Sequence, residues 1–210
     1  MTALWIWLGA AFLYAAFRGW YDNWRGPLRP DEIERFLTAM QGTPGAELND
    51  LAVVRRFLEA DDGREFLMLN LVRLAQGDVP HPSTGAPTPA PKLMREYIAG
   101  FLPTLIRHGG HPALHATKIG GYFDAWEVPP DPGWSLIGLM RYRSRRDMAL
   151  LATDPRFSDA HAFKIAAMPV TFSFPTSPML MLFISPRIWV GLVLALAAAL
   201  VHLGVLAARG

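Results

Sequence analysis

Three closely spaced histidines are the first side chains in the sequence that could do chemistry. His108, His111 and His115 form an HxxHxxxH series, and imidazole is the commonest transition-metal ligand in proteins. The surrounding pattern places His108 at a helix end, His111 in a turn and His115 in a strand, so three rings would meet on one ion only by coincidence. We predict no metal site. His115 is a candidate for catalysis or ligand binding, and the alternative is a hydrogen-bonded strand histidine.

Four arginines around a predicted helix start are the second group. Arg141 and Arg143 share one face of a strand by alternation, and Arg145 and Arg146 open the helix that follows. Such a cluster could hold a carboxylate or a phosphate. The alternative, which we favour, is a solvated edge or a surface beside lipid headgroups.

Other signatures of chemistry are missing from the sequence. The chain lacks cysteine, and it contains no P-loop, nucleotide-binding glycine fingerprint or nucleophile elbow. The Gly120-Gly121 pair is interpreted as a strand end or bulge, because no helix follows it. The formal net charge of +2 gives no support to nucleic-acid binding. We expect no cofactor and no nucleic-acid partner.

The stretch from Trp134 to Phe174 must position several of these side chains. Its capping and helix-breaking residues predict a strand, a helix and a strand. Ser144 can cap a helix, with Asp147 at the third position favouring the positive helix end. Asp154 precedes a proline and should interrupt this helix, because such residues avoid helical angles. The predicted elements are a strand from Ser135 to Tyr142, a helix from Ser144, a second helix from Phe157 to Met168 and a strand from Val170 to Phe174.

The preceding chain supplies the remaining elements. An amphipathic helical hairpin is predicted over Asp31 to Met40 and Leu48 to Ala60. Proline-rich Gln76 to Pro91 cannot form a helix or a central strand, so it is either a surface excursion or a flap over a pocket. The other predictions are a strand from Glu65 to Leu74, a helix from Leu93 to His108 kinked at Pro103, and a strand from Ala113 to Phe123. Together they give the order βαββαβ, the ferredoxin-like order.

Several short motifs in this order resemble a known family. They are Met68 to Leu74, Tyr97, Pro103, Gly109-Gly110, Arg141 to Met148, Asp154 to Met168 and Thr171. In this arrangement the chain resembles the bacterial domain-of-unknown-function family numbered 1330, which is ferredoxin-like and lies within the dimeric α/β-barrel superfamily. That superfamily includes cofactor-free monooxygenases, muconolactone-type isomerases, haem-degrading enzymes and proteins with no known reaction, so fold alone selects no activity.

The resemblance implies a pocket between the helices and the concave sheet. It makes His115, Tyr97 and Arg141 the candidate catalytic residues, and Asn70 and Tyr142 the candidate ligand-binding residues. Asn70 is an amide in an otherwise apolar strand, where an unpaired polar group costs a few kcal/mol. It therefore either pins the strand locally, which we favour, or faces a ligand.

Both ends of the chain are apolar. Ile188 to Ala208 is about 21 residues without a charge, long enough to cross a bilayer, and it predicts a transmembrane helix. Thr2 to Phe17 is shorter and is either an uncleaved anchor, which we favour, or a signal peptide. Arginines follow the first segment and precede the second, so at both segments they lie on the side of the intervening domain. This pattern predicts that the intervening domain lies in the cytoplasm, at the inner membrane of a bacterial cell.

The predicted architecture is α+β: an N-terminal anchor (1–20), a helical hairpin (21–63), a ferredoxin-like dimeric α/β-barrel domain (64–178) and a C-terminal transmembrane helix (179–210). Strands that are apolar on both faces predict a homodimer, unless the helical hairpin covers the second face. Two functions remain open. The first is a membrane-anchored domain that binds or transforms a small apolar or aromatic molecule, as a cofactor-independent monooxygenase- or isomerase-like enzyme. The second is a non-catalytic accessory or scaffold subunit of a membrane assembly.

Overall fold

The computed structural model describes residues 2–179 and 185–208 and divides them between two compact units. One unit joins the two ends of the chain, Met1–Trp24 and Met179–Gly210, and the other is Arg25–Pro178. The second unit contains a four-stranded antiparallel sheet and several helices, so the predicted α+β class is confirmed.

The unit of the chain ends is an antiparallel helix pair. Helix α1 spans Thr2–Tyr21 and helix α7 spans Pro186–Ala207. The Trp7 indole donates to His202 (3.4 Å), and the Tyr14 hydroxyl donates to the Arg187 carbonyl (2.9 Å). Among the described helices, α7 alone is long and apolar enough to cross a membrane.

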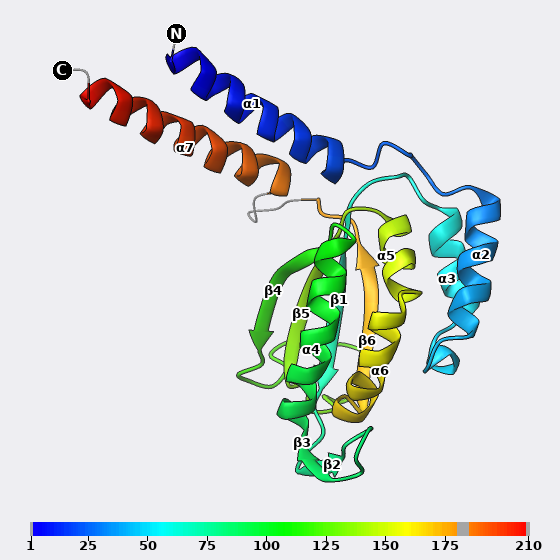
Figure 1. Cartoon of the computed structure of the whole chain (residues 1–210). Helices are drawn as coiled ribbons and strands as arrows, with labels where there is room; N and C mark the ends of the chain where they lie inside the picture. The colour runs from blue at the N-terminus through cyan, green and yellow to red at the C-terminus, as the bar shows by residue number, and fades with distance from the viewer. Residues whose placement is uncertain (1, 180–184, 209–210) are drawn as a thin grey trace. The chain divides into compact units, whose positions relative to one another are not determined.

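The sheet of the second unit has the order β4-β5-β1-β6, and all neighbours are antiparallel. Its strands are β1 (Phe66–Arg73), β4 (His111–Thr117), β5 (Leu136–Tyr142) and β6 (Val170–Thr176). Helix α4 (Ala90–Arg107) joins β1 to β4, and helices α5 (Arg145–Ala152) and α6 (Pro155–Ala167) join β5 to β6. These three helices lie on one side of the sheet (Figure 1).

The layer between these helices and the sheet is filled with apolar side chains. Phe66 and Val72 of β1 meet Leu93, Phe101 and Leu105 of α4 in one buried cluster. Helices α4 and α6 approach closely where Gly100 faces Ala160. A Cβ atom at position 100 would lie only 2.8 Å from the Ala160 Cβ, so only glycine fits there.

The other face of the sheet is also mainly apolar, and within residues 25–178 no helix covers it (Figure 1). Strand pairing places Leu69 beside Phe174 and Leu71 beside Phe172. Phe172 and Phe174 are 46% and 45% exposed. Since monomeric proteins rarely expose large contiguous apolar patches, this face has the character of an interaction surface.

The predicted helical hairpin is confirmed as α2 (Pro30–Gln41) and α3 (Leu51–Glu59), joined through the 3₁₀ turn η1 (Ala46–Leu48). Its apolar side packs on helix α5, where Ile33, Leu37 and Leu58 surround the buried Ala149. The hairpin therefore extends the helical side of the unit. The alternative that it covers the second face of the sheet is wrong.

The proline-rich segment forms two short strands, β2 (Asp78–Pro80) and β3 (Pro87–Pro89), which pair only with each other. The expectation that it supplies no central strand is confirmed. His81 holds it to the helices, because its Nε2 lies 3.0 Å from the Glu96 carboxylate and its ring meets Phe163 edge to face at 5.4 Å.

Strand β4 differs most from its prediction. It begins at His111 and ends at Thr117, so Gly120-Gly121 lies in the loop that follows and is neither a strand end nor a bulge. The physical reason is the start of its partner strand at Leu136. After the Lys118 amide has bonded to the Ser135 carbonyl (3.0 Å), β5 offers no further partner.

Candidate functional site

An open groove of about 510 Å³ lies between α4 and the β4–β5 edge of the sheet. Its walls are mainly apolar. Met94, Ile98 and Leu102 line it from α4, Pro112 and His115 from β4, and Met140 from β5.

Strand register explains why His115 faces this groove. His115 pairs with Gly138, and Pro112 pairs with Met140, with a register shift between Pro112 and Leu114. These residues therefore share one face of the sheet. Because Gly138 has no side chain, the imidazole has no cross-strand neighbour on β5.

Two polar side chains line the groove, Arg95 from α4 and His115. Both are exposed. Neither has a hydrogen-bond or ion-pair partner among the described residues. A guanidinium group stays charged at any physiological pH and matches the geometry of a carboxylate. The groove thus combines apolar walls with a cation and a proton-accepting ring.

Asn70 lies on the helix-covered face of β1, next to Gly138. Its amide nitrogen donates to the Met68 carbonyl (3.1 Å) and to the Gly138 carbonyl (3.3 Å). Both bonds tie the side chain to the strand backbone. This geometry favours the structural alternative for Asn70.

Tyr97 and Tyr142 lie together in the buried core, each 7% exposed. Their rings stack on Phe101 and Phe66 respectively, each at 5.2 Å between centroids. Burial raises the pKa of both hydroxyls, and the nearby Tyr142 raises the pKa of Tyr97 further. Both phenols therefore stay neutral at physiological pH.

Arg141 lies on the opposite face of the sheet from Met140 and Tyr142, as alternation requires. Its side chain is buried, and its Nη1 lies 3.0 Å from the Glu65 carboxylate. The three predicted catalytic residues thus occupy three environments: His115 the groove, Tyr97 the core and Arg141 the other face of the sheet. Tyr97 and Tyr142 are brought together, and Arg141 is not brought near them.

The arginine cluster does not form the predicted solvated edge, because each member has an acidic partner. Arg141 and Arg146 are only 1% and 4% exposed. The shortest distances to carboxylate oxygens are 2.5 Å for Arg143–Asp147, 3.0 Å for Arg146–Glu32 and 3.7 Å for Arg145–Asp61. The cluster is used for packing and ion pairing within the fold, which the sequence of the cluster alone did not indicate.

The three histidines lie in different surroundings. His108 Nε2 is 3.4 Å from the Asp154 carboxylate, His111 Nδ1 is 3.0 Å from the Pro112 carbonyl, and His115 faces the groove. Within the described part of the chain, no group of three histidine, cysteine or acidic residues is arranged to hold a metal ion.

Sequence reasoning missed Arg95. The buried line of α4 runs through Ala90, Leu93, Tyr97 and Phe101. Met94, Ile98 and Leu102 form the adjacent line at four-residue spacing, and this line faces the groove. The position of Arg95 beside this second apolar line is the sequence signal that could have identified it as a groove residue.

The unit Arg25–Pro178 is therefore an α+β domain with helices on one face of a four-stranded antiparallel sheet. Two crystal structures of RPA0582, a protein of unknown function from Rhodopseudomonas palustris, are similar to this chain. The methylated form is 21% identical with a TM-score of 0.53 and covers 63% of this chain and 93% of RPA0582. The other is 22% identical with a TM-score of 0.52 and covers 63% and 96%.

At this level of identity the likeness to RPA0582 shows the fold alone. No protein-family model matches the chain, and no curated protein matches it.

Proposed function

We propose that this chain is a membrane-anchored α+β protein whose groove between α4 and β4 binds a small apolar or aromatic molecule carrying an acidic group. One observation carries the proposal: Arg95 and His115 line an otherwise apolar groove, and neither has a partner among the described residues. Small-molecule sites are typically apolar clefts with a few polar groups that fix orientation.

The chemistry of the walls fits such a ligand. Met94 and Met140 are unbranched and polarizable, so they can adapt to aromatic rings of different shapes. Arg95 supplies charge for a carboxylate. If the bound molecule is transformed without a cofactor, as in a monooxygenase- or isomerase-like reaction, His115 is the groove residue that can accept a proton. Four other predicted site residues then support the fold and do not contact the bound molecule: Tyr97, Tyr142, Arg141 and Asn70.

The test compares naphthalene-2-carboxylate with its neutral carboxamide, using the full chain in lipid nanodiscs and isothermal titration calorimetry. We expect Arg95→Gln to weaken carboxylate binding roughly fivefold, corresponding to about 1 kcal/mol for an exposed ion pair, and to leave carboxamide binding unchanged. His115→Ala should weaken both.

Arg35→Gln is the matched control, because Arg35 is an exposed arginine on α2 and does not line the groove. Equal carboxylate affinity in the wild type, Arg95→Gln and His115→Ala would contradict the proposal.

A non-catalytic accessory or scaffold subunit is the second candidate function. One observation favours it: the layer between the helices and the sheet is filled with side chains, and Tyr97 and Tyr142 belong to that filling. Co-purification of a stoichiometric membrane-protein partner together with no binding in the groove would support this candidate over the first.

We further propose a ferredoxin-like, homodimeric α/β-barrel domain of the kind found in family 1330. The strand order β4-β5-β1-β6, with helical connections after β1 and β5, supports the ferredoxin-like assignment. The apolar sheet face that carries Phe172 and Phe174 supports a second copy as its cover.

The membrane part of the proposal is that α7 and α1 both span a bacterial inner membrane, with Arg25–Pro178 in the cytoplasm. The length and composition of α7 support this for one helix, and Arg18 and Arg187 lie at one end of the helix pair, as expected for a cytoplasmic side.

Reporter fusions test this topology. We expect a reporter after Gly210 to behave as periplasmic and one inserted at Thr84, in the turn between β2 and β3, to behave as cytoplasmic. A periplasmic Thr84 reporter contradicts the orientation, and a mature chain that starts near Arg18 would show that the first segment is a cleaved signal peptide.

A further inference from the structure

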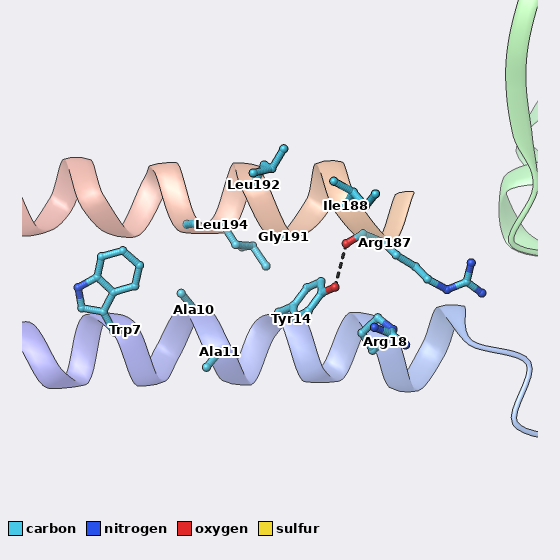
Figure 2. Close-up of a pocket in the computed structure, with 11 residues that line it drawn as sticks. Trp7, Ala10, Ala11, Tyr14, Arg18, Arg187, Ile188, Gly191, Leu192 and Leu194 are labelled. Carbon is cyan, nitrogen blue, oxygen red and sulfur yellow. Dashed lines mark hydrogen bonds between the residues drawn. The ribbon is translucent and has the colours of Figure 1, made fainter. Parts of the chain in front are cut away.

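A cavity of about 530 Å³ lies between α1 and α7 (Figure 2). Trp7, Ala10 and Tyr14 line it from α1, and Ile188, Gly191 and Ala195 line it from α7. Figure 2 shows Trp7 and Tyr14 projecting from α1 toward α7. We call this cavity the interhelical groove.

Small residues create the interhelical groove. The helices approach closely at Gly191, where a Cβ atom would lie 3.3 Å from the Tyr14 ring. The Tyr14 hydroxyl closes one end by donating to the Arg187 carbonyl (2.9 Å), and the Trp7 indole lies at the other end, where it donates to His202 (3.4 Å). Between the two rings the lining includes Ala10, Ala11 and Ala195, which leave the apolar space unfilled.

One end of the interhelical groove is cationic. Arg18 and Arg187 both line it, and both pair with Asp22, at 2.5 Å and 2.7 Å respectively. Two guanidinium groups share one carboxylate, so these three groups carry a net positive charge. Trp20 and Trp24 are 50% and 73% exposed at this same end of α1, as expected for tryptophans at the level of lipid headgroups.

We propose that the interhelical groove binds one acyl chain of an anionic phospholipid, with the lipid phosphate held by Arg18 and Arg187. The proposal rests on the proposed membrane span of α7. An apolar slot that ends at a net positive charge matches an acyl chain joined to a phosphate, and basic residues near the membrane surface favour anionic lipid. A second copy of the chain would offer an apolar helix but no anion for the cationic end.

The experiment is native mass spectrometry of the full chain released from nanodiscs that contain equal amounts of dioleoyl phosphatidylglycerol and dioleoyl phosphatidylcholine. We expect the wild type to retain phosphatidylglycerol preferentially. Ala195→Leu should fill the groove and reduce retention of either lipid by roughly tenfold. Arg18→Gln with Arg187→Gln should remove the preference for phosphatidylglycerol, because the positive end is lost.

Ala197→Leu is the matched control, because Ala197 is exposed on the same helix and does not line the groove. Equal retention in Ala195→Leu and Ala197→Leu, equal retention of both lipids by the wild type, or a wild type that is released without lipid adducts in either its monomer or its dimer overturns the proposal.

Alkaline extraction of membranes separates this proposal from the one on which it rests. Wild type and Ala195→Leu should both stay in the membrane pellet. Extraction of the wild type would overturn the membrane span itself. A wild type that stays in the pellet but shows no selective lipid retention overturns the lipid site alone.

Discussion

Replacing Arg146 by methionine is expected to destabilise helix α2 and its packing against α5 by about 3 to 5 kcal/mol, because the substitution breaks a buried ion pair. Arg146 is 4% exposed and lies 3.0 Å from the carboxylate of Glu32, which is also 4% exposed. It also donates to the carbonyls of Gly26 (2.8 Å) and Pro27 (2.9 Å). Without it, Glu32 loses its buried partner. Amide hydrogen exchange of α2 and α5 measures the loss.

The matched control is Arg55→Met, which removes an arginine that also bridges two helices, from α3 to Glu34 of α2. Both partners are exposed, so water screens the pair and replaces it when it is lost. Hydrogen exchange in α2 should change far less than in Arg146→Met. Equal effects of the two substitutions would show that burial of the Arg146–Glu32 pair is not what stabilises the hairpin.

The same ion pair predicts an acid dependence of stability. The hydrogen bond from Arg146 is the largest cause that lowers the pKa of Glu32 from 4.5 to about 2. A carboxyl group with a lowered folded-state pKa stabilises the fold fully above its unfolded value, and the contribution is lost as the pH falls. Protection of α2 amides should therefore weaken between pH 4.5 and about 2, and this weakening should be smaller in Arg146→Met, where only the backbone hydrogen bond from Arg29 and the charge of Arg25 still lower the pKa of Glu32.

The combined substitution of Phe172→Ser and Phe174→Ser is expected to convert the proposed homodimer into a monomer. The two rings stack at 6.1 Å between centroids on the uncovered face of the sheet, and each is about half exposed. Aromatic anchors at the centre of an interface typically cost about 2 kcal/mol each when truncated, and a two-fold homodimer contains two copies of each ring. The four losses should together raise the dissociation constant by about five to six orders of magnitude. Native mass spectrometry over a concentration series measures the change.

Ile106→Ser provides the control for the dimer, because Ile106 is 51% exposed on α4, on the helical side of the sheet. This variant should remain dimeric. A wild type that stays monomeric across the concentration series would sink the dimer, and a dimeric double variant would place the interface elsewhere.

Local signals predicted the start of α5 but not that of α6. The Ser144 hydroxyl accepts from the Asp147 amide (3.1 Å), so α5 begins where its predicted cap indicates. Asp154, which was predicted only to interrupt a helix, caps α6 by accepting from the Arg156 amide (2.9 Å), so α6 begins at Pro155 and not at Phe157. The end of β4 was not predictable in this way. A strand continues only while its neighbour offers partners, and the start of β5 at Leu136 depends on the tertiary fold.

The candidate site shows the same division between local and tertiary information. The resemblance assigned both Arg141 and Tyr142 to one pocket, whereas strand alternation places these neighbours on opposite faces of β5. Tyr97 was predicted to be a catalytic residue of the pocket, yet the sequence could not show that neighbouring rings fill the space around it. His115 lines the groove because a register shift in β4 aligns it with Gly138, and such a shift leaves no mark in the strand pattern.

The pairing of α1 with α7 has a consequence for the order of events during synthesis. Asp22 and Arg187, which join the two helices, are separated by 165 residues. At about 5 to 20 residues per second, the ribosome needs roughly 8 to 33 s to make the intervening chain. During that interval α1 has no helical partner, although the groups that will contact α7 are already made. The α+β unit can thus begin to fold before the helix pair exists, because α1 and α7 can pair only after α7 has been made.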